Sequence, residues 1–300
     1  MNIKKTFRHA SRIALGERLY EKIQFRRHTG YALDLTNPRT WNEKLTARKL
    51  DRGFRDALIL QDKYASRALV EARVGTKYLT EVYDITDDPV AIDPLKYPNR
   101  FVLKATNSCG PKSLFIHDKE TRCEPELARQ KAWSIFQMHD RIFDKFYYYS
   151  NEWWYGEIPK RLMVEAFLTD GHGKVPLDYK FFVFHGRVYC IQVDFGRFVD
   201  HTRAIYDRDW KRMDVRIGYP NGPEKARPAN LDEMIDVAET IAADYGFLRV
   251  DLYNIDDETI RFGETTIAPS LGHARIDPVS FDKELGALWN LAEERPSYAK

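Results

Sequence analysis

The stretch 249-RVDLYNIDDETIRFGETT-266 contains two runs of residues typical of β-strands, and each run carries one carboxylate among its apolar residues. The polar cluster at 256–259 lies between the runs, as expected for the loop of a β-hairpin. A four-residue loop there pairs Asp251 with Glu264 and Arg249 with Thr266, all on one face of the sheet. The other pairs that this loop predicts on the same face are Tyr253 with Phe262 and Ile255 with Ile260.

Two carboxylates directly opposite each other on a sheet repel, so a positive charge is expected between Asp251 and Glu264. Mg²⁺ suits this position, because it takes few protein carboxylates and completes its shell with water and phosphate oxygens. Asp251 and Glu264 are therefore candidate metal ligands. A second interpretation stays open, namely a solvated hairpin whose two rim acids are screened by Arg249.

The overall composition is that of an ordinary globular protein. With 300 residues, 43% of them hydrophobic, the chain is long enough for one large domain or for two or three lobes. The net charge is only +2, whereas nucleic-acid-binding proteins are strongly basic. Cys109, Cys123 and Cys190 form no CxxC pair, and no apolar run approaches the length of a membrane span. We therefore expect a cytoplasmic protein without a nucleic-acid partner.

The first thirty residues are the compositional exception, because basic residues far outnumber acidic ones there. Their apolar residues recur at helical spacing, which predicts one or two amphipathic helices. Such a segment can lie on the anionic inner face of a membrane, or it can dock on the protein with a solvated basic face. Both interpretations remain open.

Strand hairpins and helices are mixed along the chain without regular βαβ alternation, which favours an α+β fold built on antiparallel sheets. Helices are expected over 38–75 and 125–150, and another begins at Asn230 with a capping box formed by Glu233. The buried stripe of that last helix is expected to consist of Leu231, Ile235, Ala238, Ile241 and Tyr245. Hairpins are expected over 101–118 and over 178–195, the second with His185 and Gly186 as its turn. The predicted divisions are a basic segment 1–30, a helical region 31–98, a smaller lobe 99–168 and a larger lobe 169–300.

Two lysines lie on separate predicted strands. Lys104 ends an apolar strand before the small-residue loop 106–110, whose backbone N–H groups are suited to phosphate oxygens. Lys180 alternates with Phe182 on its own strand, so it either extends to the rim or is held for an anion. The alternative for Lys104 is a solvated edge residue. The usual nucleotide signatures, GxxxxGK[ST] and GxGxxG, do not occur.

A basic cluster follows the strand that ends near residue 195. Arg197 and Arg203, with His201 between them, could clamp a carboxylate of the substrate through bidentate hydrogen bonds. A structural ion pair with a nearby aspartate is an equally open interpretation. The aspartates near enough in sequence are Asp194, Asp200 and Asp207.

Several segments occur in the order in which the ATP-grasp superfamily has them. They are DKYASR, FVLK with its turn-rich loop, RLMVEAFL, DYKFFVFHG, LRVDLY and GETTIAP. More narrowly, the chain resembles the TupA-like branch, named for teichuronopeptide biosynthesis, from about residue 36 to 290. The segments that carry this closer resemblance are PRTWNEKL, YYYSNEWWYGEIPKRLMVEAFL, QVDFGRFVDHTRAIYDRDW and FGETT.

The resemblance implies an ATP-grasp fold in which two α+β lobes clasp ATP, with two metal ions on the last hairpin. Asp251 and Glu264 then become Mg²⁺ ligands, with Thr266 at the position where many members have Asn. Arg249 would face the acyl-phosphate. The residues implied to contact ATP are Lys104, Ser108 and Gly110 at the phosphates, Glu165, Ala166 and Phe167 at the adenine, Asp178 at the ribose and Lys180 at the phosphates.

The chemistry implied by the resemblance is an ATP-dependent carboxylate–amine ligation through an acyl-phosphate, which releases ADP and phosphate. The branch's name suggests a uronic acid, or another carboxylate of a surface polysaccharide, joined to an amine or amino acid. Two alternatives stay open. The same fold supports a kinase or phosphotransferase. The loop 106-TNSCGPKS-113 has one glycine and a proline where relatives are Gly-rich, and this departure, together with Thr266, allows a module that binds nucleotide or polysaccharide without turnover.

Overall fold

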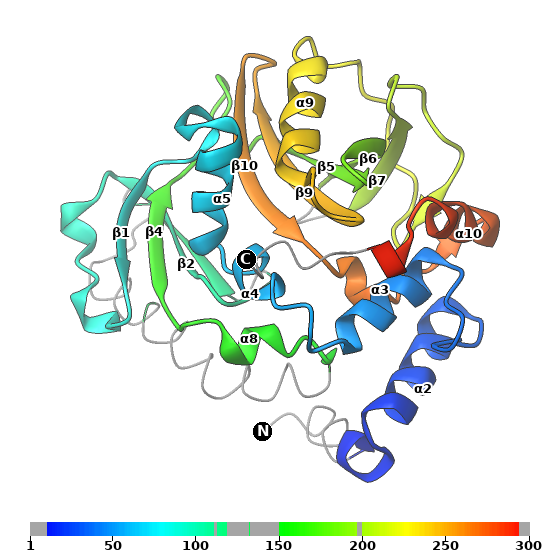
Figure 1. Ribbon diagram of the computed structural model, residues 1–300. Helices are drawn as coiled ribbons and strands as arrows, with labels where there is room; N and C mark the ends of the chain where they lie inside the picture. Colours follow the sequence, from blue (N-terminus) through cyan, green and yellow to red (C-terminus); the bar gives the residue numbers. More distant parts are fainter. Residues whose placement is uncertain (1–10, 111–112, 119–131, 133–149, 197–199, 294–300) are drawn as a thin grey trace.

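The structure, a computed structural model, describes residues 11–110, 113–118, 132, 150–196 and 200–293. These residues form two lobes, each built on an antiparallel sheet with helices packed against it (Figure 1). The α+β expectation is therefore confirmed. Among the described residues, no helix has the length and apolar character needed to cross a membrane. The expected helix 125–150 and residues 1–10 of the basic segment fall outside the described residues.

The smaller sheet has four strands in the order β1(Val82–Thr86), β4(Leu162–Ala166), β2(Arg100–Ala105) and β3(Leu114–Asp118). The hairpin expected at 101–118 is confirmed as β2 and β3, in which Lys104 pairs with Leu114. Strand β1 comes from the range 31–98 and joins this sheet through β4. Phe101, Leu103 and Val164 are fully buried and form the centre of the lobe's core.

The larger sheet has five strands in the order β10(Thr259–Thr266), β9(Phe247–Ile255), β5(Leu177–Phe184), β6(Arg187–Phe195) and β7(Thr202–Asp207). The predicted β5–β6 hairpin is confirmed, with His185 and Gly186 as its two turn residues. Both have positive φ, 46° and 74°, as a tight two-residue hairpin turn requires. Strand β5 lies at the centre of the sheet, between β6 and β9.

One face of the larger sheet is covered by α9(Leu231–Ala242) and α5(Ala65–Val74), as Figure 1 shows. Tyr179, Phe181 and Val183 of β5 point to this side and are buried. The amphipathic stripe predicted for the helix after Asn230 is confirmed. Its members, all buried, are Leu231, Ile235, Ala238, Ile241 and Tyr245.

The opposite face of the larger sheet changes character along the strands. Phe182 and Phe184 of β5 pack with Trp41 of α3(Trp41–Leu50) and with α10(Val279–Ala287) in a second core. Two residues earlier on the same side of β5, Lys180 and then Asp178 replace the rings. Helix α3 therefore covers the apolar end of this face, and a buried charged end lies beyond it.

The N-termini of α3 and α9 differ in whether a side chain caps them. Thr40 caps α3 in a full capping box with Glu43, which the sequence analysis did not identify. The capping box expected at Asn230 is wrong, since the Asn230 side chain makes no cap hydrogen bond. Glu233 instead accepts hydrogen bonds from Lys77 and Tyr78. A polar side chain that finds partners on a packed neighbour is not available to the helix end.

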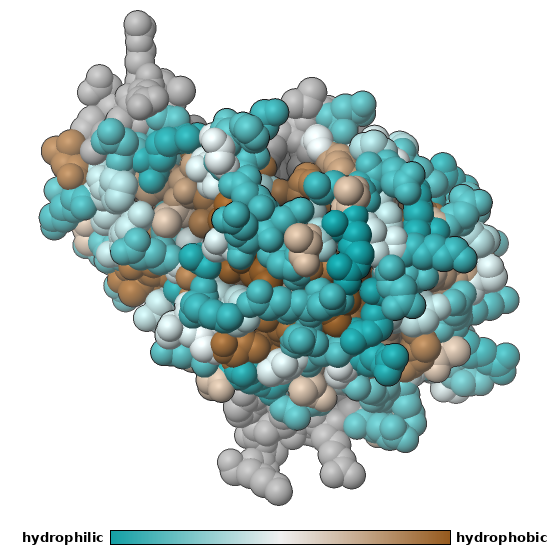
Figure 2. Space-filling model, turned by 90° about the horizontal axis from the view of Figure 1, so that it is seen from above, coloured by the Kyte–Doolittle hydropathy of each residue, from teal (hydrophilic) through white to brown (hydrophobic). Residues whose placement is uncertain are grey.

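The N-terminal helix α2(Glu17–Thr29) docks on the protein through Tyr20, Glu21 and Phe25, which are buried. Its outer side is exposed. Seen from above in Figure 2, the surface is mostly hydrophilic, and hydrophobic residues appear as smaller separate areas. The remaining short elements are α4(Ala57–Leu60), η1(Thr76–Tyr78), η2(Pro89–Ala91), η3(Pro94–Lys96), α8(Trp154–Glu157), β8(Arg216–Ile217), η7(Pro269–Gly272), β11(Ile276–Asp277) and η8(Leu291–Glu293).

Candidate active site

The hairpin of β9 and β10 pairs Asp251 with Glu264 and Arg249 with Thr266, as predicted. The register nearer the turn was predicted wrongly, because Thr259 belongs to the strand and pairs with Ile255. Phe262 accordingly pairs with Leu252, and both lie in the core on the α9 side. Ile260 and Phe262 therefore do not share a face with Asp251.

A β-bulge at Gly263 restores the predicted pairing at the end of the hairpin. The extra residue changes which face the following side chains take, so Glu264 comes back opposite Asp251. A Cβ at Gly263 would lie 3.1 Å from the Asp251 carbonyl oxygen and 3.2 Å from the Tyr253 ring. This close approach explains the glycine.

Asp251 is buried between two cations. Its carboxylate accepts hydrogen bonds from Arg249 Nε at 2.6 Å, from Arg249 Nη2 at 2.7 Å and from Lys180 Nζ at 2.5 Å. Burial raises the pKa of Asp251 above its ordinary value, although Arg249 and Lys180 oppose that shift. For Arg249, burial lowers the pKa, but the Asp251 carboxylate outweighs burial and raises it overall. We take Asp251 as ionised at neutral pH, because direct bonds to two cations favour the carboxylate.

The position between the two carboxylates is taken by the guanidinium of Arg249. Its Nη2 lies 3.5 Å from Glu264 Oε1 and donates to the Thr266 hydroxyl at 2.9 Å. Glu264 is also 3.6 Å from Lys63 Nζ, and its side chain is 39% exposed. The screening that the second interpretation predicted is therefore present. Glu264 is loosely held and accessible, whereas Asp251 is neither.

Lys180 donates to Asp178 at 2.6 Å as well as to Asp251, and all three side chains are nearly fully buried. Cross-strand pairing places Lys180 directly between Asp251 on β9 and Gln192 on β6. The predicted phosphate-binding lysine and ribose-binding aspartate thus lie together on one face of the larger sheet. Of the two interpretations for Lys180, the structure shows a lysine held inside.

Lys104 lies on the smaller sheet and forms an ion pair with Glu165 of β4. The loop after β2 is closed by its own hydrogen bonds. Ser108 Oγ donates to the Ala105 carbonyl at 3.1 Å, and the Gly110 carbonyl accepts from Ser113 Oγ at 2.7 Å. These hydrogen bonds hold the loop at the end of the strand.

The predicted adenine-contacting residues lie at the end of β4, an internal strand. Glu165 and Ala166 pair with Val102 and Phe101 of β2, and the Ala166 N–H donates to the Glu81 carbonyl. Phe167 lies just beyond the strand, with the guanidinium of Arg100 4.3 Å from its ring centroid. Phe167 is therefore the only member of this trio outside the strand pairing.

For the basic cluster after β6, the structural ion pair is the interpretation that the structure shows. Arg203 donates to Asp194 Oδ1 at 2.6 Å and to the Ile217 carbonyl at 2.6 Å, and it stacks over Tyr219. Burial raises the pKa of Asp194, but Arg203 outweighs burial and lowers it overall. His201 lies 3.4 Å from the same carboxylate. Arg197 lies outside the described residues.

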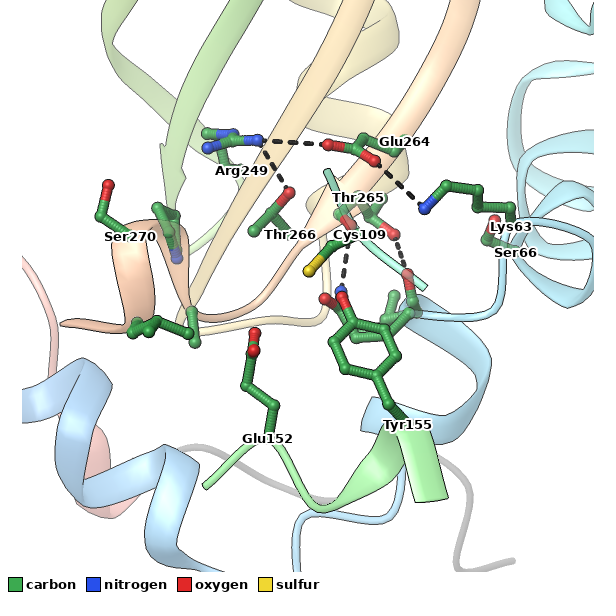
Figure 3. Close-up of a pocket in the computed structure, with 15 residues that line it drawn as sticks. Lys63, Ser66, Cys109, Glu152, Tyr155, Arg249, Glu264, Thr265, Thr266 and Ser270 are labelled. Atoms are coloured by element: carbon green, nitrogen blue, oxygen red, sulfur yellow. Dashed lines mark hydrogen bonds and ion pairs between the residues drawn. The ribbon is translucent and has the colours of Figure 1, made fainter. Parts of the chain in front are cut away.

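A cavity of about 280 Å³ opens beside the hairpin, at the junction of the two lobes (Figure 3). Arg249, Glu264 and Thr266 line one wall, and Lys63 and Ser66 reach it from the segment around α5. The loop after β2, the start of α8 and η7 close the remaining sides. The residues that these three segments contribute are Cys109, Glu152, Tyr155, Pro269, Ser270 and Leu271.

The sequence analysis did not predict that these residues line one cavity. Lys63 lies in the quoted segment DKYASR, and Glu152 lies within the aromatic run at 147–156, but neither was assigned a role. An acid isolated among buried aromatic residues was the available signal. Among the described residues, no three His, Cys, Asp or Glu side chains gather as a ready-made metal centre.

Comparison with known proteins gives a family match and distant structural likenesses. The sequence model of the TupA-like ATPgrasp family matches residues 43–290. No curated protein has significant similarity to the chain.

Among solved structures, the ATP-grasp ligase PsnB complexed with minimal precursor is 12% identical, with a TM-score of 0.43 over 79% of this chain and 61% of PsnB. The ADP complex of purK, N5-carboxyaminoimidazole ribonucleotide synthetase, is 13% identical, with a TM-score of 0.44 over 70% and 45%. D-cycloserine synthetase DcsG is 14% identical, with a TM-score of 0.43 over 77% and 69%. The chain spans less than two thirds of the first two proteins.

Proposed function

The chain belongs to the TupA-like ATP-grasp family, and we propose that it is an ATP-dependent carboxylate–amine ligase. The observation that carries this proposal is the buried group of Lys180, Asp251 and Arg249, which lies next to the accessible carboxylate of Glu264 at the edge of the cavity. Such a group keeps fixed charges in a site from which water is largely excluded. Fixed charges of this kind are what phosphoryl transfer requires of a protein.

The donor types on the hairpin fit a magnesium ion. Asp251, Glu264 and Thr266 offer carboxylate and hydroxyl oxygens, the donors that Mg²⁺ prefers, and Glu264 is accessible from the cavity. An ion shared by Asp251 and Glu264 would take the position that the Arg249 guanidinium now holds between them, so Arg249 would have to move when the ion binds. Since two carboxylates alone leave most of an octahedral shell to other oxygens, nucleotide phosphates and water would supply the rest. When bound, the ion would offset the negative charge of the phosphates.

For ATP we propose contacts on both sheets. Lys104 and Lys180 would bind the phosphates together with Ser108 and Gly110, and Asp178 would contact the ribose. The adenine would lie against the end of β4, near Glu165, Ala166 and Phe167. Each lysine already has a carboxylate partner, Lys104 with Glu165 and Lys180 with Asp178 and Asp251, so neither lysine is an unpaired cation in the interior before nucleotide binds.

In the proposed reaction the substrate carboxylate attacks the γ-phosphate of ATP, which gives an acyl-phosphate and ADP. An amine then displaces phosphate and forms the amide. Lys180 would hold the transferring phosphoryl group, and Arg249 would face the acyl-phosphate from the hairpin. Arg203 is not part of this scheme, since Asp194 and the Ile217 carbonyl already occupy its guanidinium.

For the substrates we propose a uronic acid, or another carboxylate used in surface polysaccharide synthesis, and a small amine or amino acid. This assignment is supported by the family name alone. A kinase or phosphotransferase on the same fold would retain the phosphate on its product. A nucleotide-binding or polysaccharide-binding module would bind without turnover.

We also propose that α2 contacts the inner face of an anionic membrane, with the rest of the protein in the cytoplasm. The helix is docked on one side, yet Leu19 and Ile23 are 49% and 46% exposed on the other. Arg18, Lys22 and Arg26 are exposed beside this apolar ridge. An apolar ridge flanked by basic residues is the pattern of a helix that lies in a lipid interface.

Thermal unfolding with ATP alone, Mg²⁺ alone and both tests the nucleotide and metal sites. ATP with Mg²⁺ at about a hundredfold above its Kd should add roughly 2.7 kcal/mol and raise the Tm by several degrees. Glu264→Gln should abolish the Mg²⁺-dependent part of this shift. Glu258→Gln, an exposed residue in the turn of the same hairpin, is the matched control and should retain it. Equal shifts in both variants would remove Glu264 from the metal site.

The reaction type is tested by measuring ADP and inorganic phosphate with D-glucuronate and glycinamide as probes. A ligase releases both products only when carboxylate and amine are present together. A phosphorylated product without free phosphate would indicate a kinase instead.

A further inference from the structure

Glu152 stands on the side of the cavity that faces the hairpin. Figure 3 shows its carboxylate pointing into the cavity from the segment before α8, with Arg249 and Glu264 at the opposite side. The side chain belongs to a residue that is only 5% exposed. Glu152 is the acidic residue of this wall to which neither the family resemblance nor the proposed reaction assigns a role.

One oxygen of this carboxylate has no partner. Glu152 Oε2 is buried and accepts no hydrogen bond from the described residues. The two nearby lysines are engaged elsewhere. Lys49 donates to Glu21 at 2.6 Å and to the Leu271 carbonyl at 2.7 Å, and Lys63 donates to the Ser108 carbonyl at 2.5 Å. A buried carboxylate oxygen without a partner is costly, and a cationic ligand would relieve that cost.

The backbone that carries Glu152 is held in place by Arg12 and by Glu21 of α2. Asn151 has a positive φ of 61° and makes two side-chain hydrogen bonds. Its Oδ1 accepts from Arg12 Nε at 2.8 Å, and its Nδ2 donates to Glu21 Oε2 at 2.5 Å. Glu21 also binds Lys49 and, through His273, the segment after η7. Glu152 is therefore presented to the cavity by an anchored wall.

We propose that Glu152 binds the ammonium group of the amine substrate inside this cavity, an inference that rests on the proposed ligase function. The cavity has room for a small amine. Because water occupies about 30 Å³ per molecule in the liquid, 280 Å³ holds roughly nine groups of that size. An amine of about amino-acid size fits this space, with its nitrogen between Glu152 and the acyl-phosphate that faces Arg249.

This position also provides the proton transfer that the second step needs. The ammonium gives one proton to the Glu152 carboxylate and becomes a neutral amine. The amine nitrogen attacks the acyl carbon, the C–N bond forms, and the bond from that carbon to the phosphate oxygen breaks. The departing phosphate takes the bonding electron pair and the second proton from nitrogen, which leaves an amide N–H and monohydrogen phosphate.

The electrostatic surroundings of Glu152 suit that transfer. Burial, the largest influence, raises the pKa of Glu152 to about 7, and Glu21 of α2 adds to the rise. Lys49 of α3, Ser150 and Lys63 oppose it. A proton acceptor works best when its pKa lies near the operating pH.

Glycinamide, a small primary amine without a carboxylate, is the probe for this site. Glycolamide has a hydroxyl in place of the ammonium and is the matched neutral control. Calorimetric titration at pH 7, with Mg²⁺ and a non-hydrolysable ATP analogue present, should show glycinamide binding at least tenfold more tightly than glycolamide. Glu152→Gln should abolish that preference, and Glu152→Asp should keep part of it. Glu157→Gln, an exposed residue on α8, should bind like the wild type.

Equal binding of the two probes by the wild type, or an unchanged preference in Glu152→Gln, would overturn the proposal. So would unfolding of both Glu152 variants, since it would show that the carboxylate has a structural partner. The proposed function fails separately, when ATP and Mg²⁺ do not stabilise the wild type although glycinamide is still preferred.

Discussion

Glu21 and Glu152 are both buried, with 1% and 5% of their surfaces exposed, yet their surroundings make them opposites. Glu21 accepts hydrogen bonds from Lys49, His273 and Asn151 at 2.5–2.6 Å. Burial raises its pKa, but Lys49 and His273 outweigh burial and lower it to about 2. Glu152 has one oxygen without a partner, and burial raises its pKa to about 7. The comparison teaches that partners, rather than depth, decide whether a buried acid holds the fold together or remains available to a ligand.

The largest expected effect is the loss of Glu21. Glu21→Ala leaves the fully buried Lys49 ammonium without its carboxylate, which should cost about 3–5 kcal/mol in the free energy of unfolding. Urea denaturation measures this loss. Glu157→Ala is the control, because its ion pair with Arg55 is about half exposed and should contribute less than about 1 kcal/mol. Similar losses in the two variants would show that burial adds nothing to the Glu21 network.

The pH dependence of stability should separate the two glutamates by sign. The folded pKa of Glu21 is depressed, so its contribution of roughly 3 kcal/mol is present above the unfolded pKa and is lost as pH falls from about 4.5 towards 2. The folded pKa of Glu152 is raised, so its contribution is full below about 4.5 and is lost as pH rises to about 7.

Urea unfolding of the wild type and of the Glu21→Gln and Glu152→Gln variants at pH 3, 5 and 7 measures both slopes. The free energy of unfolding of the wild type minus that of Glu21→Gln should increase from pH 3 to 5. The free energy of unfolding of the wild type minus that of Glu152→Gln should decrease from pH 5 to 7. If the two differences changed with pH in the same direction, the assignment of partners to these two acids would be contradicted.

The smallest effect is expected for Glu152→Gln at pH 8. Replacing a buried charge that lacks a partner on one oxygen by a neutral amide should raise the free energy of unfolding by about 1 kcal/mol. The same variant should lose its preference for glycinamide. A gain in stability together with a loss of ligand recognition is the mark of a residue kept for function. A clear loss of stability would place Glu152 with Glu21 among the structural acids.

The hairpin of β9 and β10 shows how far a local pattern can be followed. The opposition of Asp251 and Glu264 was predicted from alternation alone and is confirmed. The predicted pairing is correct because two deviations cancel. The loop is one residue shorter than expected, which shifts the pairing by one residue, and the bulge at Gly263 shifts it back. A single glycine inside a strand was the available signal for the bulge. Alternation does not show which face each half of a bulged strand takes.

The basic cluster around Arg203 shows a different limit. A bidentate clamp for substrate and a structural pair with Asp194 require the same residues at the same spacing. The structural pair forms because the register of β6 and β7 places Asp194 directly opposite Arg203. The Ile217 carbonyl of β8 accepts a further hydrogen bond from the same guanidinium. Long-range strand pairing therefore determined the state of a side chain that local sequence left open.

By itself, the sequence determined the strands, the turn at His185 and Gly186, the buried stripe of α9 and the opposition of two carboxylates at the end of the last hairpin. These features depend on residues close together in the chain, so periodicity and turn chemistry are enough. Only the tertiary structure decided that Arg249 lies between the carboxylates, that Lys180 is held inside and that Glu152 faces a cavity. Those outcomes depend on how strands and helices pack, from the two strands of one hairpin for Arg249 to segments 130 residues apart for the wall that carries Glu152, because packing sets the burial and the partners of each charged group.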